Sequence, residues 1–136
     1  MQTATFPGRY DSLQAISEFI QQAAKEAGLD HNATYAVELA VDEACSNIID
    51  HAYAGENKGE IECTCSRAPD ALIITLRDRG RSFDPTQAPL PNVKGPLNRL
   101  KRRGVGIYLI RNMVDEIKYE AMGDRGNLLT LVKKKL

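Results

Sequence analysis

Apolar residues recur three or four positions apart in two stretches of the first half of the chain, which is the spacing of one buried helix face. The first stretch, residues 13–27, predicts a helix that Gly28 ends. The second predicts a helix that begins at a cap, Asp30 or Asn32, and runs to about Ala54. The apolar stripe of this second helix is predicted to consist of Val37, Ala40, Val41, Ala44, Ile48 and Ala52.

Alternating apolar and polar residues predict strands elsewhere. A short strand is expected over residues 3–7, a hairpin over 60–67 and 71–78, and two closing strands over 115–122 and 127–135. A third helix between the two strand pairs completes the order. Strands and helices that cluster in this way predict an α+β fold, a two-layer sandwich with a mixed, mainly antiparallel sheet and helices on one face.

The length of 136 residues suits a single domain over residues 1–136 with one core. Eighteen basic residues balance eighteen acidic ones, so no overall field favours nucleic acid or a membrane as a direct partner. No apolar run reaches the roughly 20 residues of a membrane span, and the N-terminus lacks the regions of a signal peptide. We therefore expect a cytoplasmic protein. Cys63 and Cys65 share a strand face with Ile61, which predicts core positions rather than a zinc site.

The second helix carries more polar side chains than packing requires. At 100° per residue Glu43, Asn47 and Asp50 fall within an arc of about 60° beside the apolar stripe. An asparagine oxygen is a hard ligand that suits Mg²⁺, and a glutamate one turn away could accept a proton or orient a water. A solvated helix face is the alternative interpretation. Glu38 and Asp42 lie on another side, and we expect them to be only solvated.

A second candidate site follows the strand over residues 71–78, where Asp78 ends an apolar row and Gly80 comes two residues later. Glycine lets backbone approach a ligand closely, and a carboxylate at this place can accept a hydrogen bond from an exocyclic amine such as that of adenine. A simple Asp-x-Gly turn is the alternative.

A long basic segment follows, because residues 85–114 contain no acid. Gly104 and Gly106 precede the third predicted helix, residues 105–114, and glycine-rich backbone at a helix N-terminus presents N–H groups to phosphate. The pattern matches neither the Rossmann fingerprint nor the Walker loop. The cations of the segment are Lys94, Arg99, Lys101, Arg102, Arg103 and Arg111.

In this order the segments resemble the GHKL ATPase superfamily, whose nucleotide-binding domain is the Bergerat fold. "DEACSNIIDHAY" is similar to the N box, "DRGRSFDP" to the first glycine box and "GVGIYLI" to the second. The length, the "HAY" and the closing strands are most similar to the anti-sigma-factor serine/threonine kinases. The resemblance covers about residues 6–134.

The resemblance implies roles for single residues of the first two boxes. Asn47 would hold the Mg²⁺ that bridges the ATP phosphates, and Glu43 would be the general base toward a serine hydroxyl. Asp78 would bind the adenine amino group, and Gly80 would give the base room. Thr130 on the last strand is a candidate near adenine. Asn127 competes for that role, because relatives often place a hydroxyl residue just after the glycine.

The resemblance also implies a lid over the nucleotide. Asp84 would begin this lid, which would end near Arg103. Gly104, Val105 and Gly106 would offer backbone N–H groups to phosphate. Many relatives have glycine where this chain has Arg103, which could instead contact a phosphate directly.

The implied function is that of an ATP-binding anti-sigma regulatory factor with protein serine/threonine kinase activity. Its substrate would be a STAS-type anti-sigma antagonist, and a sigma factor or another regulator would be its second partner in a partner-switching circuit. Relatives also form homodimers. A non-catalytic switch, which holds ATP and chooses partners without transferring phosphate, is the main alternative. A degenerate domain that binds no nucleotide is a third.

Overall fold

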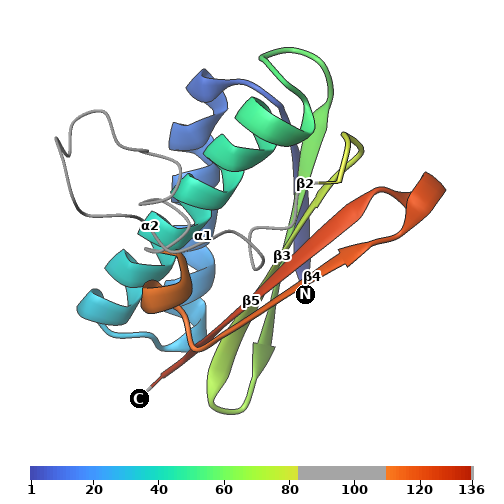
Figure 1. Ribbon diagram of the computed structural model, residues 1–136. Coiled ribbons are helices and arrows are strands. Elements are labelled where there is room, and N and C mark those ends of the chain that lie inside the picture. The colour runs from blue at the N-terminus through green and yellow to red at the C-terminus, as the bar shows by residue number, and fades with distance from the viewer. Residues whose placement is uncertain (83–109, 136) are drawn as a thin grey trace, which may run out of the picture.

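The computed structural model describes residues 1–82 and 110–135. Its strands form one layer, and two long helices cover one face of that layer (Figure 1). This confirms the predicted two-layer α+β arrangement. No helix within the described ranges is both long and apolar enough to cross a membrane. In chain order the elements are β1 (Gln2–Pro7), η1 (Tyr10–Ser12), α1 (Leu13–Ala27), α2 (His31–Asn47), η2 (Ile48–Ala52), β2 (Glu60–Ala68), β3 (Ala71–Asp78), β4 (Glu116–Ala121), η4 (Gly123–Arg125) and β5 (Asn127–Lys134).

The sheet has the strand order β1-β2-β3-β5-β4. Each pair of neighbouring strands is antiparallel, so the sheet is wholly antiparallel within the described residues. The sequence had predicted a mixed, mainly antiparallel sheet. Strand alternation then assigns every side chain to a face. The face without helices, here called the open face, carries a row of paired threonines, Thr3, Thr64, Thr75 and Thr130.

Both long helices begin close to the predicted positions, and α1 also ends where predicted. Gly28 ends α1 in the left-handed conformation, with φ 83°. Asp30 caps α2, because its side chain accepts a hydrogen bond from the Ala33 N–H at 2.7 Å. The α-helical part of α2 is shorter than predicted, because it ends at Asn47 and continues as the π-helical turn η2.

The π-helical turn has a packing consequence. The Tyr53 N–H bonds the Ile48 carbonyl at 2.9 Å, which is the wider spacing of a π-helix. Asn47, Ile48 and Ile49 are all buried at this place, although a regular amphipathic helix would turn one of three consecutive residues outward. Asn47 lies beside the buried stripe by regular helix geometry, and the wider turn after it keeps Ile49 inside, so the apolar contacts of the helix continue.

The core lies between the helices and the covered face of the sheet. The whole predicted stripe of α2 is buried, and Ile61, Cys63 and Cys65 are buried on the covered face of β2, as expected. Burial also raises the pKa of the Cys45 thiol, which packs in the same core. The three cysteines therefore act as small apolar residues of the core.

The expectation that Glu38 and Asp42 are only solvated is wrong. Glu38 Oε1 accepts hydrogen bonds from Ser17 Oγ at 2.8 Å and from Gln21 Nε2 at 2.7 Å, so this side chain joins α2 to α1. Asp42 is half-buried, and burial raises its pKa. The packing of α1 on α2, which the sequence pattern of α2 alone does not contain, explains the difference at Glu38.

Candidate functional site

A pocket between the C-terminal part of α2 and the covered face of the sheet brings Asn47 and Asp78 together. They come from different elements, since Asn47 ends α2 and Asp78 ends β3. The rest of the pocket wall is mainly apolar, which suits a flat organic base beside a few polar groups. The lining residues are Ala44, Asn47, Ile48, Ala52, Asp78, Tyr119 and Leu129.

Asp78 is a buried carboxylate with an exposed fraction of 5%. Its Oδ1 accepts hydrogen bonds from the Gly80 N–H and from Asn127 Nδ2, both at 2.9 Å. Burial raises the pKa of Asp78, and these two bonds offset part of that rise because they favour the charged form. Among the described residues no donor contacts Oδ2, so the second oxygen can accept a hydrogen bond from a ligand.

Gly80 lies against the end of η2. A Cβ at this position would stand 2.3 Å from the Ala52 carbonyl oxygen, so only glycine fits without a shift of the backbone. The following residue, Arg81, fixes the contact with two bonds of 2.9 Å, from its N–H to the Ala52 carbonyl and from Nε to the His51 carbonyl. The sequence predicted that Gly80 lets a ligand approach closely, whereas the close approach that the structure shows at Gly80 is to the backbone of η2.

Asn127 organises the turn after β3. Its Nδ2 donates to Asp78 Oδ1 and to the Gly80 carbonyl, each at 2.9 Å, and more weakly to the Arg81 carbonyl at 3.3 Å. Its Oδ1 accepts from Ser82 Oγ at 3.1 Å. One buried amide, exposed by only 3%, thus holds the Asp-x-Gly turn in shape.

Thr130 does not belong to this pocket, and its expected place near adenine is corrected. Thr130 pairs with Thr75, whereas Asp78 pairs with Asn127. Successive side chains of a strand point to opposite faces, so Asn127 shares the covered face with Leu129, and Thr130 lies on the open face. Of the two candidates on the last strand, the structure brings Asn127 to Asp78.

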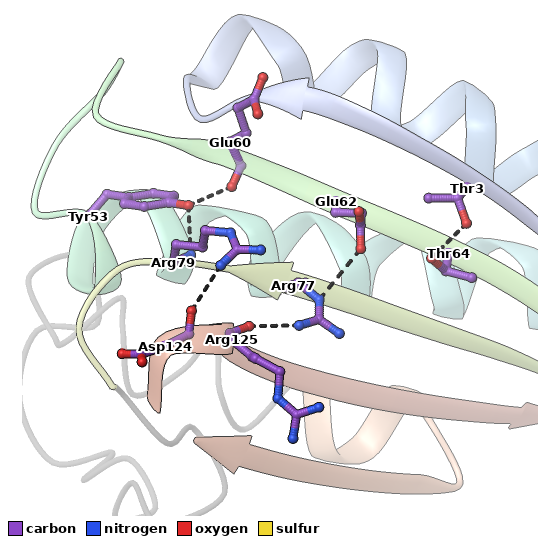
Figure 2. A network of polar contacts seen from close by, with 9 residues as sticks. All are labelled: Thr3, Tyr53, Glu60, Glu62, Thr64, Arg77, Arg79, Asp124 and Arg125. Atoms are coloured by element: carbon purple, nitrogen blue, oxygen red, sulfur yellow. Dashed lines mark hydrogen bonds and ion pairs between the residues drawn. The ribbon is translucent and has the colours of Figure 1, made fainter. Parts of the chain in front are cut away.

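Tyr53 connects the end of β3 to its surroundings, and sequence reasoning used it only as part of the "HAY" likeness. Its hydroxyl donates to the Glu60 carbonyl at 2.5 Å and accepts from the Arg79 N–H at 2.9 Å (Figure 2). Arg79 Nη1 in turn donates to the Asp124 carbonyl at 3.0 Å, in the β4–β5 hairpin. This network fixes the β3 end from the side opposite the pocket.

Asn47 contrasts with Asp78. It is also buried, with an exposed fraction of 8%, but within the described part of the chain its Nδ2 has no hydrogen-bond partner. A buried amide without a partner costs free energy, which is recovered when a ligand or water engages it. Glu43, one turn earlier on the same helix, is half-buried. Asp84, Arg103, Gly104, Val105 and Gly106 lie outside the described residues.

Comparison with known families gives a match over nearly the whole chain. The histidine kinase-like ATPase domain matches residues 6–133. The chain belongs to this family. Members of an ATPase family use ATP. The pocket contains the buried carboxylate of Asp78 and the Asn47 amide, whose nitrogen has no partner among the described residues, and these polar groups suit a nucleotide.

Curated relatives are serine-protein kinases. The chain is 33% identical over 104 residues to the serine-protein kinase RsbW of Bacillus velezensis, which covers 72% of this chain and 64% of that protein. It is 29% identical over 131 residues to RsbW of Bacillus cereus, covering 93% of this chain and 80% of that protein.

Solved structures show the same fold at lower identity. The crystal structure of the RsbU and RsbW domains of a Mycobacterium tuberculosis protein matches with a TM-score of 0.66 and 18% identity, over 98% of this chain and 32% of that one. The catalytic domain of the histidine kinase ThkA matches with a TM-score of 0.56 and 11% identity, over 99% and 98% of the two chains. These likenesses confirm the fold of the ATPase domain.

Proposed function

We propose that this chain is an ATP-dependent protein serine/threonine kinase of the cytoplasm that phosphorylates a STAS-type anti-sigma antagonist. A sigma factor, or another regulator, is the second partner that it holds and releases in a partner-switching circuit. The single observation that carries the proposal is the pocket that unites Asn47 and Asp78. The names of the curated relatives support the choice of a serine kinase over other ATPases.

Adenine recognition is assigned to Asp78. Because Oδ1 is engaged by Asn127 and Gly80 and no donor among the described residues contacts Oδ2, Oδ2 accepts a hydrogen bond from the adenine amino group. The apolar wall formed by Ile48 and Leu129 covers the faces of the base. This arrangement discriminates against guanine, which has a carbonyl oxygen where adenine has its amino group and would place it against the carboxylate.

Mg²⁺ is assigned to the side-chain oxygen of Asn47, and the unpartnered Nδ2 of the same amide is assigned as a hydrogen-bond donor to a phosphate oxygen. The described residues contain no group of three or more histidines, cysteines or acids that could hold a metal ion, so this part of the chain offers no complete metal cage. That suits Mg²⁺, which usually binds through one or two protein oxygens while phosphates and waters complete its shell. When bound, the ion neutralises phosphate charge as the γ-phosphoryl group is transferred.

The phosphates are assigned to the second glycine box. Gly104, Val105 and Gly106 offer backbone N–H groups, and Arg103 contributes a guanidinium. Asp84 begins the lid that continues to about Arg103. These assignments rest on the resemblance of the sequence to the family.

Glu43 is assigned the role of general base. A serine oxygen of the partner attacks the γ-phosphorus, the bond from that phosphorus to the β–γ bridging oxygen breaks, and ADP leaves with the electron pair. The Glu43 carboxylate accepts the hydroxyl proton. Phosphoryl transfer depends mainly on positioning and charge stabilisation, so the carboxylate also aligns the incoming hydroxyl.

The test uses γ-labelled ATP with Mg²⁺ and the STAS-type antagonists of the same organism. We expect phosphoserine on one of them, and we expect Glu43→Gln to lose transfer by at least about a hundredfold while ATP affinity is retained. Transfer at the wild-type rate by Glu43→Gln would contradict the base assignment. Binding of ATP and antagonist without any transfer by the wild type would replace the kinase with the non-catalytic switch.

A further inference from the structure

The protein substrate must reach Glu43, and the described residues leave one side of α2 for it. The side toward the sheet is filled by the core stripe. The side toward α1 is closed, because Glu38 bonds both Ser17 and Gln21. The side that remains contains Tyr35, Leu39, Asp42 and Glu43, and it is here called the α2 outer face. This inference rests on the proposed kinase function.

Exposed tyrosines lie on both sides of Glu43. Apart from Met1, the exposed large hydrophobic residues of the described chain are Tyr35, at 63%, and Tyr10, at 43%. Tyr35 precedes Glu43 on α2 by eight residues, or about 12 Å along the helix axis. Tyr10 donates a hydrogen bond to Asp50, which follows Glu43 by two helical turns. Within residues 1–82 and 110–135, the exposed large apolar side chains other than Met1 thus lie around the proposed base.

The separation of the tyrosines fits the size of a protein interface. A standard interface covers about 800 Å² on each partner, which corresponds to a disc with a radius of about 16 Å. A disc centred on Glu43 therefore includes Tyr35 and the Tyr10–Asp50 pair. Exposed tyrosines are enriched at interfaces and often carry much of the binding energy. Leu39, half-buried between Tyr35 and Glu43, continues the apolar surface.

The charge of this region specifies the partner. From residue 32 to residue 50 the sequence has four acids and no lysine or arginine. One of the four, Glu38, is used between the helices, and Asp42, Glu43 and Asp50 remain on or beside the α2 outer face. Acidic surfaces attract basic ones and repel other acidic surfaces, which fixes orientation and partner choice.

We propose that the α2 outer face, from Tyr35 to the Tyr10–Asp50 pair, is the docking surface for the protein substrate. The substrate presents its serine within a basic patch, next to an apolar contact that receives Tyr35. Basic side chains beside the serine pair with Asp42 and Asp50, and the serine hydroxyl is presented to the Glu43 carboxylate.

The experiment measures steady-state phosphorylation of the STAS-type antagonist that the wild type phosphorylates. We expect Tyr35→Ala to raise KM for the antagonist at least about tenfold, with kcat and the affinity for ATP unchanged. Tyr35→Phe keeps the ring and restores most of the affinity. Lys118→Ala, an exposed change on the opposite side of the sheet, is the matched control and leaves KM unchanged.

A charge variant provides an independent arm. Asp42→Asn raises KM severalfold and makes KM less sensitive to salt, whereas Asp70→Asn, an exposed acid in the β2–β3 turn, changes neither. If Tyr35→Ala also loses ATP affinity, its effect is not specific to docking, and the KM of Asp42→Asn then decides whether the docking surface is correct. The docking surface is overturned if both variants behave like their controls. That result would be a KM for Tyr35→Ala within twofold of that for Lys118→Ala, together with a KM for Asp42→Asn within twofold of that for Asp70→Asn. Absence of transfer by the wild type itself overturns the proposed function instead.

Discussion

The two ends of the pocket differ in how completely the protein satisfies its own polar groups. At the Asp78 end, Asn127, Gly80 and Arg81 form a closed set of hydrogen bonds that joins β3, β5 and η2. At the Asn47 end, a buried amide nitrogen has no partner within the described residues. We propose that the first end is a preformed receptor for a base and that the second is completed by the ligand.

This difference separates stability from function. Groups in the closed set support both the fold and the nucleotide, so their loss should reduce stability and affinity together. The Asn47 Nδ2 makes no hydrogen bond to another described residue. Removal of the Asn47 side chain should therefore reduce ligand binding with little effect on stability. The predictions below test this separation, beginning with the largest expected effect.

Gly80→Ala should have the largest effect on the fold. The new methyl group would stand 2.3 Å from the Ala52 carbonyl oxygen, and backbone cannot yield as a flexible side chain does. We expect the free energy of unfolding to fall by about 3 kcal/mol or more, as measured by chemical denaturation. Gly123→Ala is the control: its φ is 58° but nothing lies within 4 Å, so the loss there should be about 1 kcal/mol. Equal losses for the two variants would show that the contact with η2 is not tight.

Asn127→Ala should come next, because it removes the donor shared by Asp78, Gly80 and Arg81. We expect a loss of about 2–3 kcal/mol in unfolding free energy, since buried acceptors are left without a partner. Affinity for ATP, measured by calorimetry, should fall at least about tenfold because Asp78 is no longer held in place. Thr130→Ala, on the open face, should leave ATP affinity unchanged. A larger loss of ATP affinity in Thr130→Ala than in Asn127→Ala would place Thr130 in the pocket.

The pH dependence of stability should be a smaller effect. The pKa of Asp78 is raised above its ordinary 3.8 in the folded protein, so the folded state binds the proton more tightly than the unfolded state does. Stability from this group is therefore fully present below about pH 3.8 and is lost as pH rises through the folded pKa. Asp78→Asn lacks this loss, whereas Asp42, whose pKa is also raised, affects both proteins alike.

The measurement is the difference in unfolding free energy between wild type and Asp78→Asn, followed upward from pH 3.8. We expect the wild type to become less stable relative to the variant as pH rises. A difference that stays constant across this window would mean that the bonds from Asn127 and Gly80 fully offset the burial of the carboxylate.

Much of the fold could be predicted from the sequence because its signals are local. Alternation placed β2 and β3 within a residue or two, and a glycine marked the end of α1. The π-helical turn η2 could not be predicted, because it depends on burying Asn47, Ile48 and Ile49 against other elements. Glu38 looked solvated for the same reason: its partners belong to α1.

The candidate site shows where local signals fail. Asn47 and Asp78 were recognised from residue type and spacing, and the fold brings them to one pocket. The prediction for Thr130 was wrong because it used the residue type and did not consider which face of the sheet each residue of the strand occupies. The alternation of Leu129, Thr130 and Leu131 already turns the threonine away from the core, but the pairing of Asp78 with Asn127 is needed to know which residue the pocket receives.

The most direct test of the account is the effect of Mg²⁺ on ATP affinity in wild type and Asn47→Ala, measured by calorimetry together with the unfolding free energy of each protein. We predict that Mg²⁺ strengthens ATP binding to the wild type, that it has no such effect on Asn47→Ala, and that the two proteins differ in stability by less than about 1 kcal/mol. An Asn47→Ala protein that keeps the full Mg²⁺ effect would contradict the claim that this end of the pocket is completed by metal and phosphate.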